Sequence, residues 1–238
     1  MQILTICVIV KSDSMTTAAV IPAHNEAKRV SAVAVASLQF VDKVILVDDG
    51  STDSTWEVLQ GLAKQYPRQI IALHHQVNLG KGAALKTGCD AAMRLKLDAI
   101  VCLDSDGQHN PASIPQFTAK LSTGNVDVVF GARTFNSKMP MMMLFGNRFL
   151  SQCINSLFRV MVQDTQSGFR AFTALAYQEL RWHSSGYEVE TEMIVRTGEH
   201  KLRYTEVDID TIYHDNYKGT TVIDGLKIFF RILRWKLV

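Results

Sequence analysis

Two closely spaced carboxylates, Asp104 and Asp106, follow the apolar run AIVCL and are followed in turn by Gln108 and His109. Carboxylates at this spacing can hold a hard divalent cation such as Mg²⁺ or Mn²⁺, together with water and phosphate oxygens. A diphosphate leaving group needs such a cation, because negative charge builds up on it as its bond to carbon breaks. Two solvated turn carboxylates are the simpler alternative, since D-x-D is common, but the amide and the imidazole that follow favour a binding site.

Polar side chains follow each of five apolar, β-branched runs, which are Ala18–Pro22, Val44–Val47, Ile70–Leu73, Ala99–Leu103 and Val126–Phe130. In order along the chain, these polar groups are His24, Asn25 and Glu26, then Asp48 and Asp49, then Asn78, then Asp104 and Asp106, and finally Arg133. The carboxyl ends of parallel strands share one edge of a sheet, and ligands bind in the crevice there. The pattern therefore predicts one ligand site that is assembled from these strand ends.

The segments between the apolar runs have helical composition and period, near residues 26–38, 54–66, 81–96 and 111–122. This alternation predicts βαβ units, and hence an α/β fold with a Rossmann-like, mostly parallel central sheet and helices on both faces. Ser54 and Glu57 have capping-box spacing at the start of the second helix. Further helices are expected at 141–161 and 222–238, and a strand at Val207–Tyr213.

The acidic pair Asp48 and Asp49 and the glycine-rich segment NLGKG are the next candidates. The two acids could belong to a plain strand-to-helix turn, but they could also accept hydrogen bonds from nucleobase N–H groups or ribose hydroxyls. Gly80 and Gly82 allow a close backbone approach at a helix N-terminus, where a phosphate is favoured, and Lys81 would add positive charge. The alternative is a glycine-rich turn with an exposed lysine, because NLGKG matches neither of the common nucleotide-loop patterns.

The composition is that of an ordinary globular protein, with 47% hydrophobic and 20% charged residues among 238. The net charge of +2 gives little support for nucleic-acid binding. The four cysteines are far apart and lack C-x-x-C spacing, which argues against a disulfide framework or zinc site and fits a reducing, cytoplasmic setting. No apolar run reaches the roughly 20 residues of a spanning helix. Residues 1–14 are expected to be an N-terminal extension rather than a signal peptide, and residues 15–221 one catalytic domain.

Residues 222–238 are expected to form an amphipathic C-terminal helix. Its charged stripe comprises Asp224, Lys227, Arg231 and Arg234, and its wide apolar side comprises Leu226, Ile228, Phe229, Phe230, Ile232, Leu233, Trp235 and Leu237. An apolar face edged with cations suits a helix that lies in a membrane interface. Packing on the domain, or on a second subunit of a homo-oligomer, is the alternative, so the sequence leaves the partner of this helix open.

The segments VIPAHNEA, VILVDDGSTDST, NLGKGAALKTG, DSDGQH, GAR and DTQSGFRAF, read in order, resemble family 2 inverting glycosyltransferases, closest to the polyprenyl-phosphate (dolichyl-phosphate) hexosyltransferase branch. The resemblance runs from about residue 17 to 215, and DDGSTDST followed by D-x-D-x-Q-H is its most specific part. It implies the GT-A fold, a nucleotide-diphosphate sugar donor of the GDP-mannose or UDP-glucose type, and Mg²⁺ or Mn²⁺. It also implies a polyprenyl-phosphate acceptor. The enzyme would then be a peripheral protein at the cytoplasmic face of a membrane. Ser105 departs from the alanine often found between the two aspartates.

The resemblance further implies roles for individual residues. Those that would face the nucleoside are Pro22, Ala23, Asn25, Glu26, Asp48 and Asp49. Asp104 would hold the ribose or the diphosphate, while Asp106 and Gln108 would ligate the metal. Arg133 in GAR and Arg170 in SGFR would meet phosphate charge from the acceptor or the donor, a role that guanidinium forks suit. For each arginine the alternative is a structural ion pair.

The acceptor decides whether a general base is needed. A sugar hydroxyl needs one, and Asp164, Glu188 and Glu190 are candidates, whereas a lipid phosphate is already anionic. The resemblance favours the phosphate, with a saccharide hydroxyl acceptor and a catalytically silent, membrane-bound scaffold as alternatives. A sugar-nucleotide pyrophosphorylase would carry G-x-G-x-R after the first strand, where this chain reads PAHNEAKR.

Overall fold

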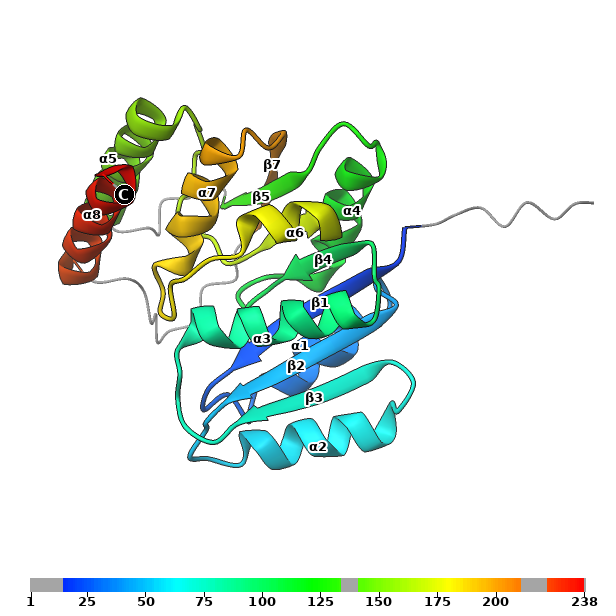
Figure 1. Cartoon of the computed structure of the whole chain (residues 1–238). Helices are drawn as coiled ribbons and strands as arrows, with labels where there is room; N and C mark the ends of the chain where they lie inside the picture. The colour runs from blue at the N-terminus through cyan, green and yellow to red at the C-terminus, as the bar shows by residue number, and fades with distance from the viewer. Residues whose placement is uncertain (1–14, 134–140, 211–221, 238) are drawn as a thin grey trace, which may run out of the picture.

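The computed structural model describes residues 15–133, 141–210 and 222–237, and the expected extension at residues 1–14 lies outside them. A seven-stranded sheet with the order β3-β2-β1-β4-β6-β5-β7 forms the centre of the molecule (Figure 1). Its strands are β1 (Thr17–Ala23), β2 (Lys43–Asp49), β3 (Ile70–His75), β4 (Ala99–Cys102), β5 (Val128–Arg133), β6 (Arg170–Thr173) and β7 (Tyr204–Ile209). β6 is antiparallel to β4 and β5, and the other neighbouring pairs are parallel.

Helices cover both faces of this sheet, as the sequence predicts (Figure 1). The helices on one face are α1 (Val30–Ser37), α2 (Thr55–Gln65) and α4 (Ile114–Ser122), which follows the short 3-10 helix η1 (Pro111–Ser113). The helices that contribute to the core on the other face are α3 (Lys81–Arg94), α5 (Met141–Phe158), α6 (Ala174–Leu180), α7 (Val189–Glu199) and α8 (Val222–Leu237). The α/β class and the mostly parallel sheet are therefore confirmed.

The central strands are buried along their whole length because both of their faces are covered. Every residue of β1 and β4 is buried, which is why these runs read as continuous apolar stretches rather than as an alternation. β3 lies at the edge of the sheet, and its side chains are mostly half-buried. The parallel strands β1, β2, β4 and β5 end at the same edge, on the left in Figure 1, so the polar residues that follow them share one region.

Three elements were not predicted from the sequence. β6 is only four residues long, and α6 and α7 follow it without a long apolar period.

The predicted capping box of α2 is also absent, since the side chain of Ser54 makes no capping hydrogen bond. The backbone N–H of Thr55 donates instead to Asp53 Oδ1 at 2.9 Å.

α8 packs on α5 and α7 through part of its apolar side. Ile232 is completely buried there, and Phe229 and Trp235 pack against the same core. Phe230 nevertheless leaves 65% of its surface exposed. Residues 211–221, which include the end of the strand expected at Val207–Tyr213, and the side chains of residues 222–228 lie outside the described part. Within the described residues, none of the helices combines the length and the hydropathy needed to span a bilayer.

Two helical glycines give a test of how tightly α3 packs on the sheet. A methyl group at Gly88 of α3 would overlap with Cγ1 of Val20 on β1, whereas one at Gly61 of α2 would meet nothing within 4 Å. Both changes gain about 0.5–1 kcal/mol of helix propensity. We expect Gly61→Ala to raise the free energy of unfolding by that amount and Gly88→Ala to lower it by about 1–3 kcal/mol through overpacking. Urea unfolding of the two variants would measure both changes, and stabilisation by Gly88→Ala would contradict the packing described.

Candidate functional site

A lysine between two carboxylates forms the centre of the carboxyl edge of the sheet. Lys81, the first residue of α3, places its Nζ 2.5 Å from Oδ1 of Asp104 and 2.7 Å from Oε1 of Glu190. Asp104 follows β4, and Glu190 lies in the first turn of α7, so three separate elements converge on one cation. The Lys81 side chain is mostly buried, and the flanking carboxylates raise its pKa although burial opposes this. The ammonium group therefore stays charged at neutral pH.

The electrostatics of the D-x-D segment differ between its two aspartates. Burial opposes ionisation of Asp104, but the neighbouring charge of Lys81 outweighs burial and lowers the pKa of Asp104. For Asp106, burial and the nearby charge of Asp104 together raise the pKa of the carboxyl group. Burial also lowers the pKa of His109, whose Nδ1 lies 4.0 Å from Oδ2 of Asp104. Ionisation of Asp106 is therefore opposed in this structure, and a cation bound beside it would stabilise its charged form.

The oxygens around Asp106 fit a hard divalent cation. The Gln108 side chain lies 2.8 Å from Asp106 Oδ2, and the Gln108 backbone N–H donates to Asp106 Oδ1 at 3.0 Å. Turning over the Gln108 amide would present its oxygen beside the carboxylate, because the two orientations differ little in shape. Within the described residues, no three or more His, Cys, Asp or Glu side chains are grouped to hold a metal. Carboxylate, amide, water and diphosphate oxygens together form the donor set that Mg²⁺ and Mn²⁺ prefer.

Asp48 and Asp49 point to opposite sides of β2 and have different partners. Asp48 is fully buried, its Oδ2 lies 2.8 Å from Nδ1 of His74, and its Oδ1 has no hydrogen-bond partner. Asp49 accepts from the backbone N–H groups of Leu79 and Gly80 at 3.0 and 2.8 Å. Asp49 therefore fixes the loop that leads into α3, and Asp48 retains an unused acceptor atom.

The loop after β1 is held against the turn that follows β2. Pro22 and Ala23 are the last residues of β1, and Ala23 pairs with Asp48 in the parallel ladder. Asn25 has a positive φ of 56°, and its Oδ1 accepts from the backbone N–H of Thr52 at 2.8 Å. Glu26 is nearly buried and pairs with Arg29 at 3.2 Å. These residues thus lie beside Asp48 at one end of the carboxyl edge.

The glycines of NLGKG allow a close approach, but by the protein itself. A methyl group at Gly80 would overlap with the carbonyl oxygen of Ser185, and one at Gly82 would overlap with that of Ser184. The backbone N–H of Ala83 donates to Ser185 O at 3.2 Å. In the structure, the segment that leads into α7 makes the close approach to these two glycines. Lys81, however, points to the centre of the site rather than to solvent, against the exposed-lysine alternative.

Arg133 lies at the end of β5 and forms a two-pronged ion pair with a buried aspartate. Its Nε is 2.5 Å from Oδ2 of Asp164, and its Nη2 is 3.0 Å from Oδ1. Burial opposes ionisation of Asp164, but the hydrogen bonds and charge of Arg133 lower its pKa. The charge of Arg133 also acts on Asp104 and His109, which places it close to the centre of the site.

Arg170 departs from the expectation that it meets phosphate. The side chain is almost completely buried, and its three nitrogens donate to the carbonyls of Ser167, Glu190 and Thr165. Burial lowers the pKa of Arg170 to about 10, so the guanidinium keeps its charge at neutral pH. In this arrangement Arg170 ties the segment before β6 to α7 and has no face directed at a ligand.

The structure also adds two residues that the site assignment from the sequence omitted. Glu190, considered only as a general base, is a partner of Lys81, and its second oxygen is buried without a hydrogen bond. His109, noted only as part of DSDGQH, is buried beside Asp104, and its Nδ1 also lacks a hydrogen bond. The signal for Glu190 was weak because α7 itself was not predicted.

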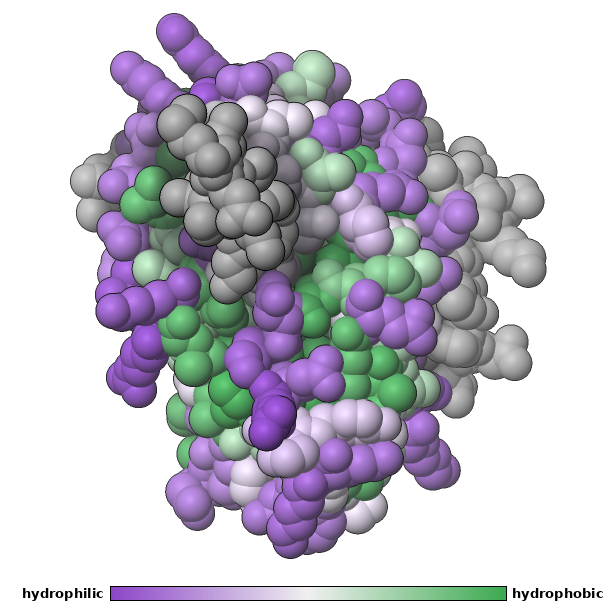
Figure 2. Space-filling model, turned by 90° about the vertical axis from the view of Figure 1, so that its right-hand side faces the viewer, coloured by the Kyte–Doolittle hydropathy of each residue, from purple (hydrophilic) through white to green (hydrophobic). Residues whose placement is uncertain are grey.

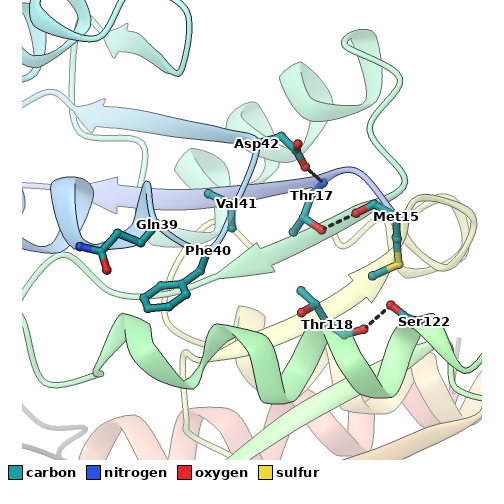
Figure 3. A pocket seen from close by; sticks show the side chains of 8 residues that line it. All are labelled: Met15, Thr17, Gln39, Phe40, Val41, Asp42, Thr118 and Ser122. Atoms are coloured by element: carbon teal, nitrogen blue, oxygen red, sulfur yellow. Dashed lines mark hydrogen bonds between the residues drawn. The ribbon is translucent and has the colours of Figure 1, made fainter. Parts of the chain in front are cut away.

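A separate pocket of about 410 Å³ opens at the amino ends of the strands (Figure 3). Its lining residues are Met15, Thr17, Gln39, Phe40, Val41, Asp42, Thr118 and Ser122. Figure 2 views the molecule from this side and shows hydrophobic residues framed by hydrophilic ones. Because Thr17 begins β1, this pocket lies at the opposite end of the strands from the lysine centre and does not belong to the same site.

The glycosyl transferase family 2 model matches residues 18–173. A UDP-N-acetylglucosamine–dolichyl-phosphate N-acetylglucosaminyltransferase of Methanococcus voltae is 35% identical over 239 residues, covering 92% of this chain and 95% of that protein. A dolichyl-phosphate β-glucosyltransferase of Trichomonas vaginalis is 28% identical over 247 residues, covering 92% of this chain and 75% of that protein.

Solved structures confirm the GT-A fold. Glucosyl-3-phosphoglycerate synthase from Mycobacterium tuberculosis, in complex with Mn²⁺, UDP-glucose and phosphoglyceric acid, superposes with a TM-score of 0.71. The alignment covers 94% of this chain and 80% of that one at 21% identity. Mannosyl-3-phosphoglycerate synthase from Rubrobacter xylanophilus gives a TM-score of 0.66 at 17% identity, covering 93% of this chain and 75% of that one.

The pair of Arg133 with Asp164 should carry far more stability than an exposed pair of the same type. Removing one partner of a buried ion pair costs about 3–5 kcal/mol, so we expect Asp164→Asn to lower the free energy of unfolding by that amount. Asp127→Asn is the control, because Asp127 forms a similar two-pronged pair with the exposed Arg203, and such pairs contribute about 1 kcal/mol or less.

The pH dependence of this difference has a defined sign. A carboxyl group whose pKa is lowered by folding adds stability above its ordinary pKa of 3.8 and loses it as the pH falls further. The difference between wild type and Asp164→Asn should therefore shrink below about pH 4. Chemical unfolding from pH 3 to 7 would measure this, and equal losses in both variants at neutral pH would argue against the buried pair.

Proposed function

The chain belongs to glycosyl transferase family 2, and from that membership we propose that it transfers a hexose from a nucleotide-diphosphate sugar to polyprenyl phosphate with inversion. The named activities of the relatives, an N-acetylglucosaminyltransferase and a glucosyltransferase acting on dolichyl phosphate, support this acceptor. The name of the former supports a UDP sugar as the donor in this proposal. The enzyme class is that of a glycosyltransferase.

The observation that carries the phosphate acceptor is that all three candidate bases are held by cations. Asp164 is paired with Arg133, Glu190 with Lys81, and Glu188 with Arg231. A carboxylate that took a proton from a sugar hydroxyl would lose its charge and leave the paired cation uncompensated. A phosphate acceptor needs no such transfer, because it is already anionic.

The donor would lie along the carboxyl edge, with its nucleoside toward β2 and its diphosphate toward the D-x-D segment. The nucleoside contacts we propose come from Pro22, Ala23, Asn25, Glu26 and Asp48, whereas Asp49 acts mainly by fixing the loop before Lys81. Asp104 would hold the ribose or the diphosphate. Asp106 and Gln108 would hold Mg²⁺ or Mn²⁺, which would neutralise charge building up on the leaving diphosphate.

The chemical step then consists of one displacement. An oxygen of the acceptor phosphate attacks the anomeric carbon from the side opposite the diphosphate, and a new C–O bond forms as the old one breaks. The electron pair leaves with the nucleoside diphosphate, and no proton has to move. The contribution of this chain is to hold both reactants in line and to stabilise negative charge on them, where Lys81 and Arg133 supply positive charge.

The polyprenyl chain of the acceptor requires contact with a membrane, and α5 and α8 offer a surface for it. Phe149 on α5 and Phe230 on α8 are 54% and 65% exposed, and both rings pack on Phe229 between them. Arg234 and Lys236 supply cations in the last turn of α8. Exposed aromatics edged by cations favour the interfacial region of an anionic membrane. We propose that the enzyme is peripheral to the membrane through this surface.

A transfer assay with purified protein tests the function directly. We expect sugar transfer to a polyprenyl phosphate from one donor among UDP-N-acetylglucosamine, UDP-glucose and GDP-mannose, and loss of transfer with EDTA or in Asp106→Ala. The same donor should raise the melting temperature only when Mn²⁺ is present, because a ligand that binds the folded state stabilises it. Transfer to a free saccharide but not to the lipid would overturn the acceptor, and a lack of stabilisation by every nucleotide would favour a silent scaffold.

Vesicle binding tests the membrane surface. We expect Phe230→Ser and Phe149→Ser to weaken co-sedimentation with anionic phospholipid vesicles several-fold, since each removes an exposed aromatic anchor. The control is Leu175→Ser, because Leu175 on α6 is 76% exposed but lies outside this surface. Equal effects of all three changes would indicate non-specific adsorption rather than docking through α5 and α8.

A further inference from the structure

Arg231 connects the C-terminal helix to the start of α7. Its guanidinium donates to the carboxylate of Glu188, the residue immediately before α7, across 43 positions of sequence. The Arg231 side chain is 50% exposed, whereas that of Glu188 is 16% exposed. The arginine is therefore accessible from solvent, and its partner forms part of the protein surface beneath it.

This ion pair lies at the rim of the lysine centre. Glu188 is two residues before Glu190, which holds Lys81 together with Asp104. Tyr187, adjacent to Glu188, has its ring centroid 5.9 Å from Nζ of Lys81. Arg231 is thus joined through Glu188 to the segment whose Tyr187 and Glu190 contact Lys81.

The other cations of this region already bind buried groups of the protein. Lys81 lies between two carboxylates, and Arg133 donates hydrogen bonds from two nitrogens to the buried Asp164. Arg170 is buried among backbone carbonyls. An acceptor phosphate that arrives from solvent would have to break one of these arrangements or bind elsewhere. The Arg231 side chain is half exposed, so its guanidinium could rotate toward the phosphate at a lower cost in free energy.

The position of Arg231 on α8 also suits an acceptor with one anionic and one apolar end. Phe230, the preceding residue, is exposed, and Leu233 is 37% exposed. A phosphate held at Arg231 would leave its hydrocarbon chain beside these apolar side chains. A guanidinium fork can bind two phosphate oxygens at once, and a phosphate carries more negative charge than a single carboxylate.

On the basis of the proposed function, we propose that Arg231 positions the acceptor phosphate and that Glu188 occupies its guanidinium until the acceptor binds. Glu188 then competes with the substrate for the same cation. The two residues should consequently act on acceptor binding in opposite directions, which a purely structural ion pair would not do.

The test is the KM for a short, water-soluble polyprenyl phosphate at saturating donor. We expect Arg231→Gln to raise this KM roughly ten- to a hundredfold, since it removes charge-assisted hydrogen bonds to the phosphate. Glu188→Gln should lower the same KM, because the competing carboxylate charge is gone. The donor KM should stay unchanged in both. Arg181→Gln is the control, because Arg181 forms a similarly exposed ion pair with Asp90 and belongs to neither proposed binding surface, and it should leave the acceptor KM unchanged.

Other outcomes would overturn this inference in distinguishable ways. If the pair only holds α8 in place, both single changes should impair the enzyme together with its melting temperature, and the charge-exchanged double variant Arg231→Glu with Glu188→Arg should restore it. An unchanged acceptor KM in Arg231→Gln would exclude Arg231 as the phosphate ligand while leaving the proposed function intact. Failure of the wild type to transfer sugar to the polyprenyl phosphate would instead overturn the proposed function itself.

Discussion

The ammonium group of Lys81 holds together the elements that make up the site. These three buried charges depend on one another, because removal of one partner would leave a buried charge uncompensated. The contact fixes the start of α3, the loop after β4 and the first turn of α7 relative to one another. The other features of the carboxyl edge are arranged around this point, including the packing of the Ser184–Ser185 backbone against Gly80 and Gly82.

The segment DTQSGFR, residues 164–170, packs against the residues around Lys81. A Cβ atom at Gly168 would lie 2.5 Å from Oδ2 of Asp104, so a larger residue there would displace the Asp104 carboxylate. Asp164, at the start of the segment, holds Arg133, and Arg170, at its end, anchors the carbonyls of Ser167 and Glu190. This segment therefore acts chiefly by placing Asp104 and Arg133, and its own arginine contributes through backbone contacts.

The sequence alone predicted the candidate site residues that come directly after strands. The apolar runs before Asp48 and Asp104 locate strands reliably because buried parallel strands are apolar throughout, and the D-x-D segment follows such a run directly. The partners of these residues could not be predicted in the same way. Glu190 lies 86 positions after Asp104 on a helix without a clear apolar period, and the role of Arg170 depends on burial that its sequence context does not reveal.

The two halves of the site consequently differ in how they are built. The proposed donor contacts come from loops directly after strands, where the sheet sets their positions rigidly. The proposed acceptor contacts come from α5, α7 and α8, which are held by helix packing and by ion pairs between elements such as that between Arg231 and Glu188. Substitutions in α8 can therefore change how an acceptor is received without moving Asp104 or Asp106. A scaffold of this kind can keep one donor chemistry while its acceptor side adapts to different anionic lipids.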